Sequence, residues 1–417
     1  MDIFQALKTS TFRQSAITST STMISAILGA FFYFILAKTL YPAEYGQFSL
    51  AITLIPMLAG VLDLGTSKAL IKFIPSHKTQ DQKFALAKTI LFLKLAIGIT
   101  GVVALWIFAS PLSVYLLRQP DLAPLMPLVG VGILSQLLFS FSIYLLQALE
   151  KYKHWGSLLV GTNLLRLLAL IFLIYIHRLN PTSALALFAL LPLLGFIVSC
   201  LFIDTRTFSS HFSPKFLSQI FSFNKWLTLS SLITAVSSRL DIIFTGRLLS
   251  LVSTGVYTLS TQMVAPFPQL VTAVSAVTTS KFASFTSTHH NRQYVKKAVL
   301  LNSFIGFFLA IVLIPIALIV VWFTGEKYIQ AIIPFLILLA GQILFFSITP
   351  LQDSILYFYG KSSFTFIIGS VSIIALISLN QILIPKLGIP GAALAVLINI
   401  AIISLITLWY YHNRVTS

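Results

Sequence analysis

KTLYPAEYGQFSLA (Lys38 to Ala51) and RLLSLVSTGVYTLS (Arg247 to Ser260) are two copies of one pattern. Each reads as a basic residue, any residue, Leu, five residues, Gly, any residue, Phe or Tyr, any residue and Leu. The matched glycines, Gly46 and Gly255, lie 209 residues apart, half of the 417-residue chain. Because several positions match at one offset, the pattern predicts an internal duplication and a protein of two equivalent halves.

The composition indicates a membrane protein. Hydrophobic residues make up 57% of the sequence and charged residues 9%, whereas soluble domains carry about 25% charged residues. Apolar runs of about 20 residues indicate membrane-spanning helices, and these runs lack the alternation of a membrane β-barrel. The sequence therefore predicts an all-α polytopic membrane protein.

Twelve apolar segments are long enough to cross a bilayer. They are residues 14–37, 47–67, 89–109, 124–148, 157–176, 182–203, 226–246, 254–276, 298–323, 331–357, 362–384 and 388–411. Six fall in each half, so both halves have the same orientation. We expect two six-helix lobes, residues 1–205 and 206–417, related as a parallel repeat around a central cavity.

Lys and Arg residues indicate the orientation of the chain. With the N-terminus in the cytoplasm, 18 of the 27 fall in cytoplasmic segments, 6 in outer segments and 3 within spans. This split predicts that both termini lie in the cytoplasm. The net charge of +17 is spread over the gaps between apolar runs, so we attribute it to orientation and expect no nucleic-acid partner.

Sequence motifs for catalysis are missing. No HExxH pattern occurs, and no two of the ten acidic residues are closer than 18 positions. The GKS of Gly360–Ser362 resembles the end of a phosphate-binding loop, but that loop needs Gly where the chain has Ile355. Cys200 is the only cysteine, so no disulfide forms within the chain. We expect no enzymatic activity, no cofactor and no metal site.

Three ionisable residues lie deep within apolar segments. Arg166 is the tenth residue of a 20-residue segment, and Arg239 and Asp241 lie deep in segment 226–246. An ionisable side chain within a span usually faces a cavity or a partner, and we expect a cavity for Arg166 and Arg239. Two Arg and one Asp favour an anionic cargo. Arg239 and Asp241, two positions apart, should not pair on a helix.

Lys94, Asp63 and Asp353 lie nearer the cytoplasmic ends of their segments, where side chains reach the interface. For these three we favour ion pairing between helices over a place in the cavity. The candidate substrate-binding residues are Arg239, Arg166 and, on the cavity alternative, Lys94. The candidate ion-coupling residues are Asp241 and, on the same alternative, Asp63.

Two trios of hydroxyl residues also align at the offset of 209. They are Ser19, Thr22 and Ser25 in the first segment, and Thr228, Ser231 and Thr234 in the seventh. A spacing of three places each trio on one side of its helix. Close helix packing and a wet cavity that binds sugar hydroxyls are both open alternatives.

Three stretches resemble the polysaccharide-repeat flippases, the O-antigen and capsule exporters of the multidrug/oligosaccharidyl-lipid/polysaccharide exporter superfamily. They are ILAKTLYPAEYGQFSLA (35–51), SRLDIIFTGRLLSLVSTGVYTLS (238–260) and IPKLGIPGAALAVLI (384–398). The resemblance covers nearly the whole chain and rests on the order and spacing of these stretches.

The resemblance implies two six-helix lobes with segments 1, 2, 7 and 8 lining the cavity, and so Arg239 and Asp241 facing it. It implies moving a polyprenyl-pyrophosphate-linked oligosaccharide from the inner to the outer leaflet of the cytoplasmic membrane, without ATP and with coupling to an ion gradient. The expected partners are this lipid-linked oligosaccharide, membrane lipids and the polysaccharide polymerase machinery.

Other classes fit the sequence less well. Multidrug exporters of the same superfamily are the alternative transporter, but they usually rely on acidic cavity residues, and this chain has ten acids in all. Lipid II flippases carry two more helices, and IKFIPSHKTQDQKF (71–84) lacks the loop motif of the major facilitator fold. A non-transporting structural or receptor protein, the second alternative, would need neither buried Arg nor a duplicated core.

Overall fold

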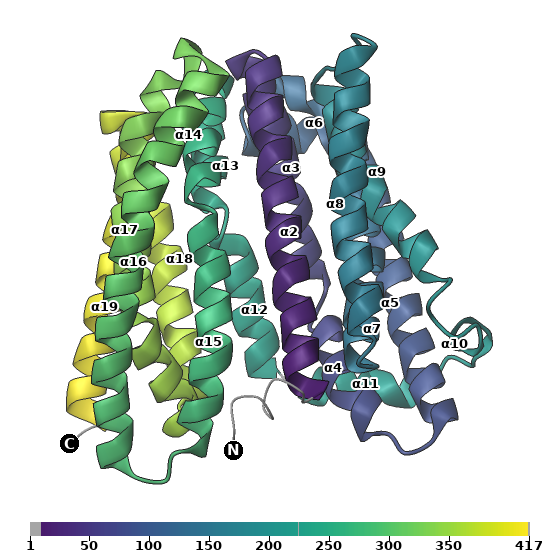
Figure 1. The fold of residues 1–417 in the computed structure, drawn as a ribbon. Helices are drawn as coiled ribbons and strands as arrows, with labels where there is room; N and C mark the ends of the chain where they lie inside the picture. The colour runs from purple at the N-terminus through teal and green to yellow at the C-terminus, as the bar shows by residue number, and fades with distance from the viewer. Residues whose placement is uncertain (1–9, 224, 416–417) are drawn as a thin grey trace. The chain divides into compact units, whose positions relative to one another are not determined.

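The computed structural model describes residues 10–223 and 225–415. Every regular element in these residues is helical, which confirms the predicted all-α class (Figure 1). The chain divides into two compact units, Met1–Leu36 with Ala51–Leu232, and Ala37–Leu50 with Ile233–Ser417. The lobe limits expected from the repeat, 1–205 and 206–417, stay a prediction, because the units are grouped by packing and the lobes by sequence.

The first unit is built mainly from long helices that end in short irregular turns. Its elements are most of α2 (Ser10–Thr39), most of α3 (Pro42–Leu62), α4 (Thr66–Ser76), α5 (Gln80–Ile107), α6 (Ala109–Pro111), the π-helix Leu112–Leu116, the 3₁₀ helix Pro120–Leu125, α7 (Met126–Ala148), α8 (Tyr152–Tyr175), α9 (Pro181–Ser199), α10 (Arg206–Ser209) and α11 (Pro214–Phe223). Helix α7 packs against both α5 and α9. Buried Leu86, Ile90 and Phe141 form part of the core that α5 and α7 share.

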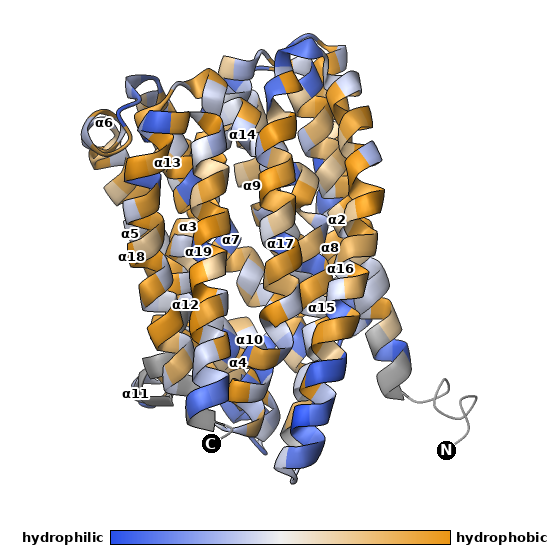
Figure 2. Cartoon of the chain, turned by 90° about the vertical axis from the view of Figure 1, so that its left-hand side faces the viewer, coloured by the Kyte–Doolittle hydropathy of each residue, from blue (hydrophilic) through white to orange (hydrophobic). Residues whose placement is uncertain are grey.

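The chain enters the second unit within α12. The elements that follow are α12 (Lys225–Ser237), α13 (Leu240–Leu248), α14 (Leu251–Val264), α15 (Pro266–Ser284), α16 (Thr288–Thr324), the 3₁₀ helix Glu326–Ala331, α17 (Ile332–Asp353), the π-helix Ser354–Phe358, α18 (Ser362–Leu387), α19 (Ile389–Tyr410) and the π-helix Tyr411–Val415. Helix α17 packs against α16 and α19. Figure 2 shows hydrophobic residues along much of the long helices and hydrophilic residues toward their ends.

Ten helices in the described residues are long and apolar enough to cross a membrane, and they correspond to ten of the twelve predicted segments. The other two, 226–246 and 254–276, are wrong as single helices. The first is divided into α12 and α13, and the second into α14 and α15. The ten helices and these two divided segments account for the twelve predicted spans.

Polar side chains and a proline lie at the two breaks. At the end of α12, the Ser237 hydroxyl donates to Ile233 O (2.8 Å) and the Ser238 hydroxyl donates to Ala235 O (2.9 Å). Such bonds compete with the helical backbone pattern. Helix α15 begins at Pro266, which has no backbone N–H to continue α14. Hydropathy counts apolar residues and does not register either effect.

The two copies of the repeated pattern contact each other within the second unit. A Cβ added to Gly46 would overlap the backbone oxygen of Leu251 and lie 3.0 Å from the nitrogen of Gly255. A Cβ added to Gly255 would overlap the oxygen of Pro42 and lie 3.1 Å from the nitrogen of Gly46. Pro42 and Leu251 are themselves 209 residues apart. The contact is therefore reciprocal, like an interface between two copies of one surface.

Side chains around this crossing are fully buried. Phe48 and Tyr257, equivalent positions of the pattern, are each 0% exposed. Nearby, the Lys327 ammonium donates to the carbonyl oxygens of Lys38 (3.0 Å) and Leu40 (2.8 Å). A cation thus stabilises carbonyl groups at the end of α2 that have no partner within the helix. The sequence repeats itself at the place where the two copies must fit one another.

Candidate functional site

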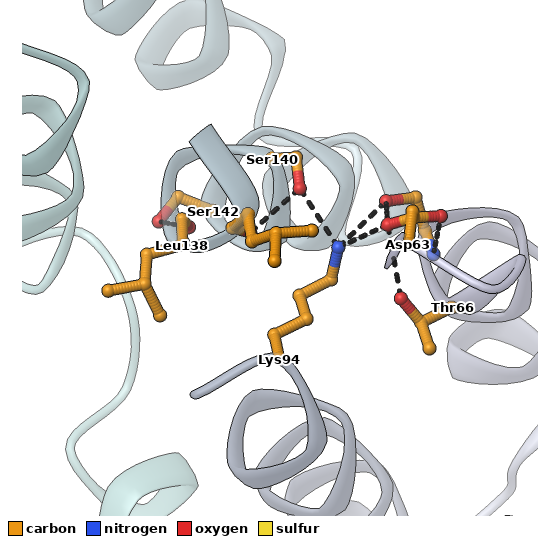
Figure 3. A network of polar contacts seen from close by, with 8 residues as sticks. Asp63, Thr66, Lys94, Leu138, Ser140 and Ser142 are labelled. Carbon is orange, nitrogen blue, oxygen red and sulfur yellow. Dashed lines mark hydrogen bonds and ion pairs between the residues drawn. The ribbon is translucent and has the colours of Figure 1, made fainter. Parts of the chain in front are cut away.

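A buried lysine is the centre of a network of polar contacts that includes two of the predicted residues (Figure 3). Lys94, on α5, is 1% exposed, and its ammonium forms an ion pair with Asp63. The ammonium also donates to the hydroxyls of Ser67 (3.1 Å) and Ser140 (2.9 Å). An ammonium group has three N–H donors, so these three acceptors satisfy it. The ion pairing that we favoured for Lys94 and Asp63 is confirmed.

The carboxylate of Asp63 is held by a break in the chain. Helix α3 ends at Leu62, and Leu64 (φ 48°) and Gly65 (φ 77°) adopt left-handed backbone before α4 begins. Asp63 then accepts from the Thr66 hydroxyl (3.1 Å), the Ser67 hydroxyl (2.6 Å) and the Ser67 N–H (3.2 Å). The predicted segment 47–67 is wrong beyond residue 62, because a left-handed turn cannot continue a helix.

Arg166, near the middle of α8, lies among uncharged groups. Its Nη1 donates to Asn163 Oδ1 (3.0 Å), and Asn163 donates to the Ser25 hydroxyl of α2 (2.6 Å). The guanidinium carbon is 4.5 Å from the ring centre of Phe188 and 5.9 Å from that of Phe32. The Nε atom is buried and has no hydrogen-bond partner.

No acid neutralises Arg166 within the part of the chain that the structure describes. Lys94–Asp63 and Arg206–Asp204 are ion pairs in the described residues, with nitrogen and oxygen within 4 Å, and neither involves Arg166. Aromatic faces attract a guanidinium but do not cancel its charge. An unpaired donor and an uncompensated cation inside a membrane protein suit an anionic ligand.

Arg239 and Asp241 lie where α12 gives way to α13. Arg239 has non-helical backbone (φ −140°, ψ 7°), and Asp241 is in the first turn of α13. The Asp241 carboxylate accepts a hydrogen bond of 2.7 Å from the hydroxyl of Tyr257 on α14. Within the described residues Arg239 and Asp241 form no ion pair, as expected. Sequence reasoning missed Tyr257 as a partner, although the repeated pattern contains it.

The remaining predicted residues also have neutral partners. Asp353 accepts a hydrogen bond from the Thr278 hydroxyl (3.0 Å). No cation pairs with it among the described residues, so the ion pairing that we favoured for Asp353 is wrong. From the hydroxyl trios, Ser25 accepts from Asn163 and Ser231 accepts from Lys68 (2.7 Å). Among the trio residues, the side chain of Thr228 is not described by the structure. Both trios therefore contribute polar acceptors, and the choice between packing and cargo binding stays open.

The sequence matches a known family over most of this region. The family model, described as polysaccharide biosynthesis protein, covers residues 12–282, well over half of the 417 residues. The chain belongs to this family. The matched range of this polysaccharide biosynthesis family member contains all five candidate residues: Arg239, Arg166, Lys94, Asp241 and Asp63.

Individual relatives agree with the family. A Shigella flexneri protein assigned as an O-antigen transporter is 22% identical over 391 residues, covering 90% of this chain and 91% of that protein. A structure of the lipid II flippase MurJ in an inward closed conformation has a TM-score of 0.76 at 19% identity, covering 94% of this chain and 86% of that chain. An inward-facing multidrug resistance MATE family transporter has a TM-score of 0.72 at 15% identity, covering 94% of each chain. These structures show the same fold.

Proposed function

We propose that this protein is a flippase that moves a polyprenyl-pyrophosphate-linked oligosaccharide across the cytoplasmic membrane for surface polysaccharide synthesis. The family, the O-antigen transporter relative and the fold shared with MurJ support this. The observation that carries the proposal is the Arg166 guanidinium, which has a buried unpaired Nε and no carboxylate partner. A pyrophosphate supplies the charge and the acceptors that it lacks.

Multidrug export fits the fold but not the charges. The MATE neighbour has a similar fold, but the deep cations here favour an anion over a cationic drug. We propose that the lobes 1–205 and 206–417 open a cavity first to one leaflet and then to the other. Arg239 and Arg166 bind the cargo headgroup in this cavity. Lys94 is satisfied by Asp63 and two serines, so it contacts cargo only if this pair opens.

Replacing the two deep arginines tests the cargo contact. Arg239→Ala and Arg166→Ala should each reduce surface polysaccharide at least tenfold in a strain that depends on this protein. Arg→Lys variants should keep partial transport, because Lys retains the charge but loses the bidentate fork. Arg178→Ala is the matched control, since Arg178 is exposed just beyond α8. The readout is surface polysaccharide divided by the amount of protein in the membrane.

Thermal stability separates cargo binding from a structural role. An uncompensated charge disfavours the folded state, so Arg166→Ala should unfold at an equal or higher temperature while transport falls. Normal polysaccharide at normal expression in both alanine variants would remove these residues from the cargo site. A parallel fall of stability and transport would instead make Arg166 structural.

We further propose that Asp241 takes up a proton or cation during the cycle, with Asp63 as a second candidate. Asp241 lies deep within the predicted segment 226–246, and its carboxylate accepts a hydrogen bond from the neutral Tyr257 hydroxyl. Asp241→Asn keeps an acceptor for Tyr257, so the variant should fold and lose its dependence on an ion gradient. Transport into vesicles, measured with and without an imposed gradient, gives the answer. Gradient dependence equal to that of the parent chain would exclude Asp241.

The proposed orientation places both termini in the cytoplasm. Single cysteines, introduced after Cys200→Ser, should react with an impermeant reagent added outside cells when they replace Glu44, Gln119 or Glu326. They should stay unlabelled when they replace Gln80, His154 or His290. Because the expectation rests on the 18 to 6 split of Lys and Arg, the opposite labelling pattern would overturn it.

A further inference from the structure

A cavity of about 250 Å³ lies within the first unit, where several helices end. It is lined by residues at the end of α4, in the first two turns of α5, around the end of α7 and at the start of α10. Its inner wall is apolar and buried, and includes Ile74, Ala87 and Leu145. None of the five residues assigned above to cargo or ion coupling lines it.

Cations dominate the rim of this cavity. Lys83, Lys151 and Arg206 line it together with one acid, Asp204, which leaves two positive charges in excess. Arg206 donates to Asp204 (2.7 Å), and its guanidinium lies 5.0 Å from the ring centre of Phe84. These hydrogen bonds lower the pKa of Asp204, so the acid remains charged and orients the guanidinium. Asp81 adds a further negative charge near Arg206.

The two lysines differ in their partners. The Lys151 ammonium donates once, to the carbonyl oxygen of Phe202 (2.8 Å), which leaves two of its three N–H groups for a ligand. The Lys83 backbone N–H donates to Thr79 O (3.3 Å), but the Lys83 ammonium forms no hydrogen bond or ion pair with any residue that the structure describes. Both ammonium groups thus have donors for oxygen atoms entering the cavity, while the fork of Arg206 is occupied.

The surroundings point to a lipid. The cavity lies at the first turns of α5, a membrane-span helix. Leu149, on its rim, is 37% exposed, and Leu201, next to Phe202, is 81% exposed. Exposed leucines beside the cations suit acyl chains, and a basic pocket between spans on the cytoplasmic side suits an anionic head group. We propose that this cavity binds the phosphate group of an anionic phospholipid through Lys83 and Lys151.

Lipid-dependent stabilisation of the purified full chain tests the proposal. Phosphatidylglycerol added to the detergent-solubilised protein should raise its unfolding temperature, and phosphatidylcholine at the same concentration should not. Lys83→Gln and Lys151→Gln should each weaken the apparent affinity for phosphatidylglycerol about fivefold, since a cation near an anionic surface contributes about 1 kcal/mol. Lys78→Gln and Lys153→Gln are matched controls, because both lysines are exposed nearby and neither lines the cavity.

Three results would contradict the lipid site. Equal stabilisation by phosphatidylcholine, or equal loss of affinity in the control variants, would overturn the site. If inorganic phosphate stabilises the protein as strongly as phosphatidylglycerol does, the ligand of this site is a soluble phosphate and not a lipid. Lys151→Gln also removes the bond to Phe202 and could unfold the protein for that reason. In that case Lys83→Gln alone tests the site, by native mass spectrometry that counts the phosphatidylglycerol molecules bound to it. Binding should persist in Arg166→Ala and Arg239→Ala, because the site does not depend on the proposed cargo contact.

Discussion

Gly46→Ala should prevent accumulation of folded protein in the membrane, and Gly255→Ala should do the same. The new Cβ would overlap a backbone carbonyl oxygen, of Leu251 in the first variant and of Pro42 in the second. A side chain can rotate away from such a clash, but here one helix must move from the other. Overpacking typically costs about 1–3 kcal/mol, and a forced backbone shift places these variants at or above that range.

Two other helical glycines provide the control. Gly29 and Gly161 have no heavy atom within 4 Å of an added Cβ, and Ala is favoured over Gly in a helix by about 1 kcal/mol. Gly29→Ala and Gly161→Ala should therefore keep or raise the unfolding temperature. Because the contact is reciprocal, Gly46→Ala and Gly255→Ala should have similar effects. Normal yield and stability of either variant would show that the two copies do not meet as closely as described.

The repeat shows how far sequence reasoning reaches in this fold. An offset of 209 shared by Gly46 and Gly255 predicts equivalence, and equivalence says nothing about contact. The need for glycine at both positions comes from backbone atoms of Pro42 and Leu251, which no residue pattern identifies. The span count was predictable because hydropathy is additive along the chain. The breaks at Ser238 and Ala265 were not, because the hydropathy of a segment does not depend on its backbone conformation.

The candidate site was predictable in its members more than in its geometry. Placing an ionisable residue in an apolar segment is costly, so the positions of Arg166, Lys94 and Asp241 within such segments identified them as candidates. Two of them have partners from other parts of the chain: Lys94 pairs with Asp63 in the turn after α3, and Asp241 accepts from Tyr257 on α14. Spacing within one segment does not encode such contacts. Arg166 was placed in the right segment, but its aromatic neighbours could not be predicted.

Breaking the Lys94–Asp63 pair should destabilise the first unit, and the two single variants should differ. Lys94 is 1% exposed and Asp63 is 20% exposed. Asp63→Asn leaves a buried ammonium with uncharged partners only, the new amide oxygen and the hydroxyls of Ser67 and Ser140. Removing one partner of a buried pair typically costs about 3–5 kcal/mol, and we expect a loss in this range. Lys94→Met leaves Asp63 with its donors from Thr66 and Ser67, so the loss should be about 1–2 kcal/mol.

The double variant Lys94→Met/Asp63→Asn separates pairing from general damage. It has no unpaired buried charge, so its free energy of unfolding should lie close to that of Lys94→Met and well above that of Asp63→Asn. Reversible unfolding in detergent of the parent, both single variants and the double variant gives the coupling energy. Lys78→Met is the control, because Lys78 is exposed; we expect a change below about 1 kcal/mol. Additive losses in the double variant would mean that the ion pair contributes no coupling, and that Lys94 and Asp63 are held by their serine and threonine partners alone.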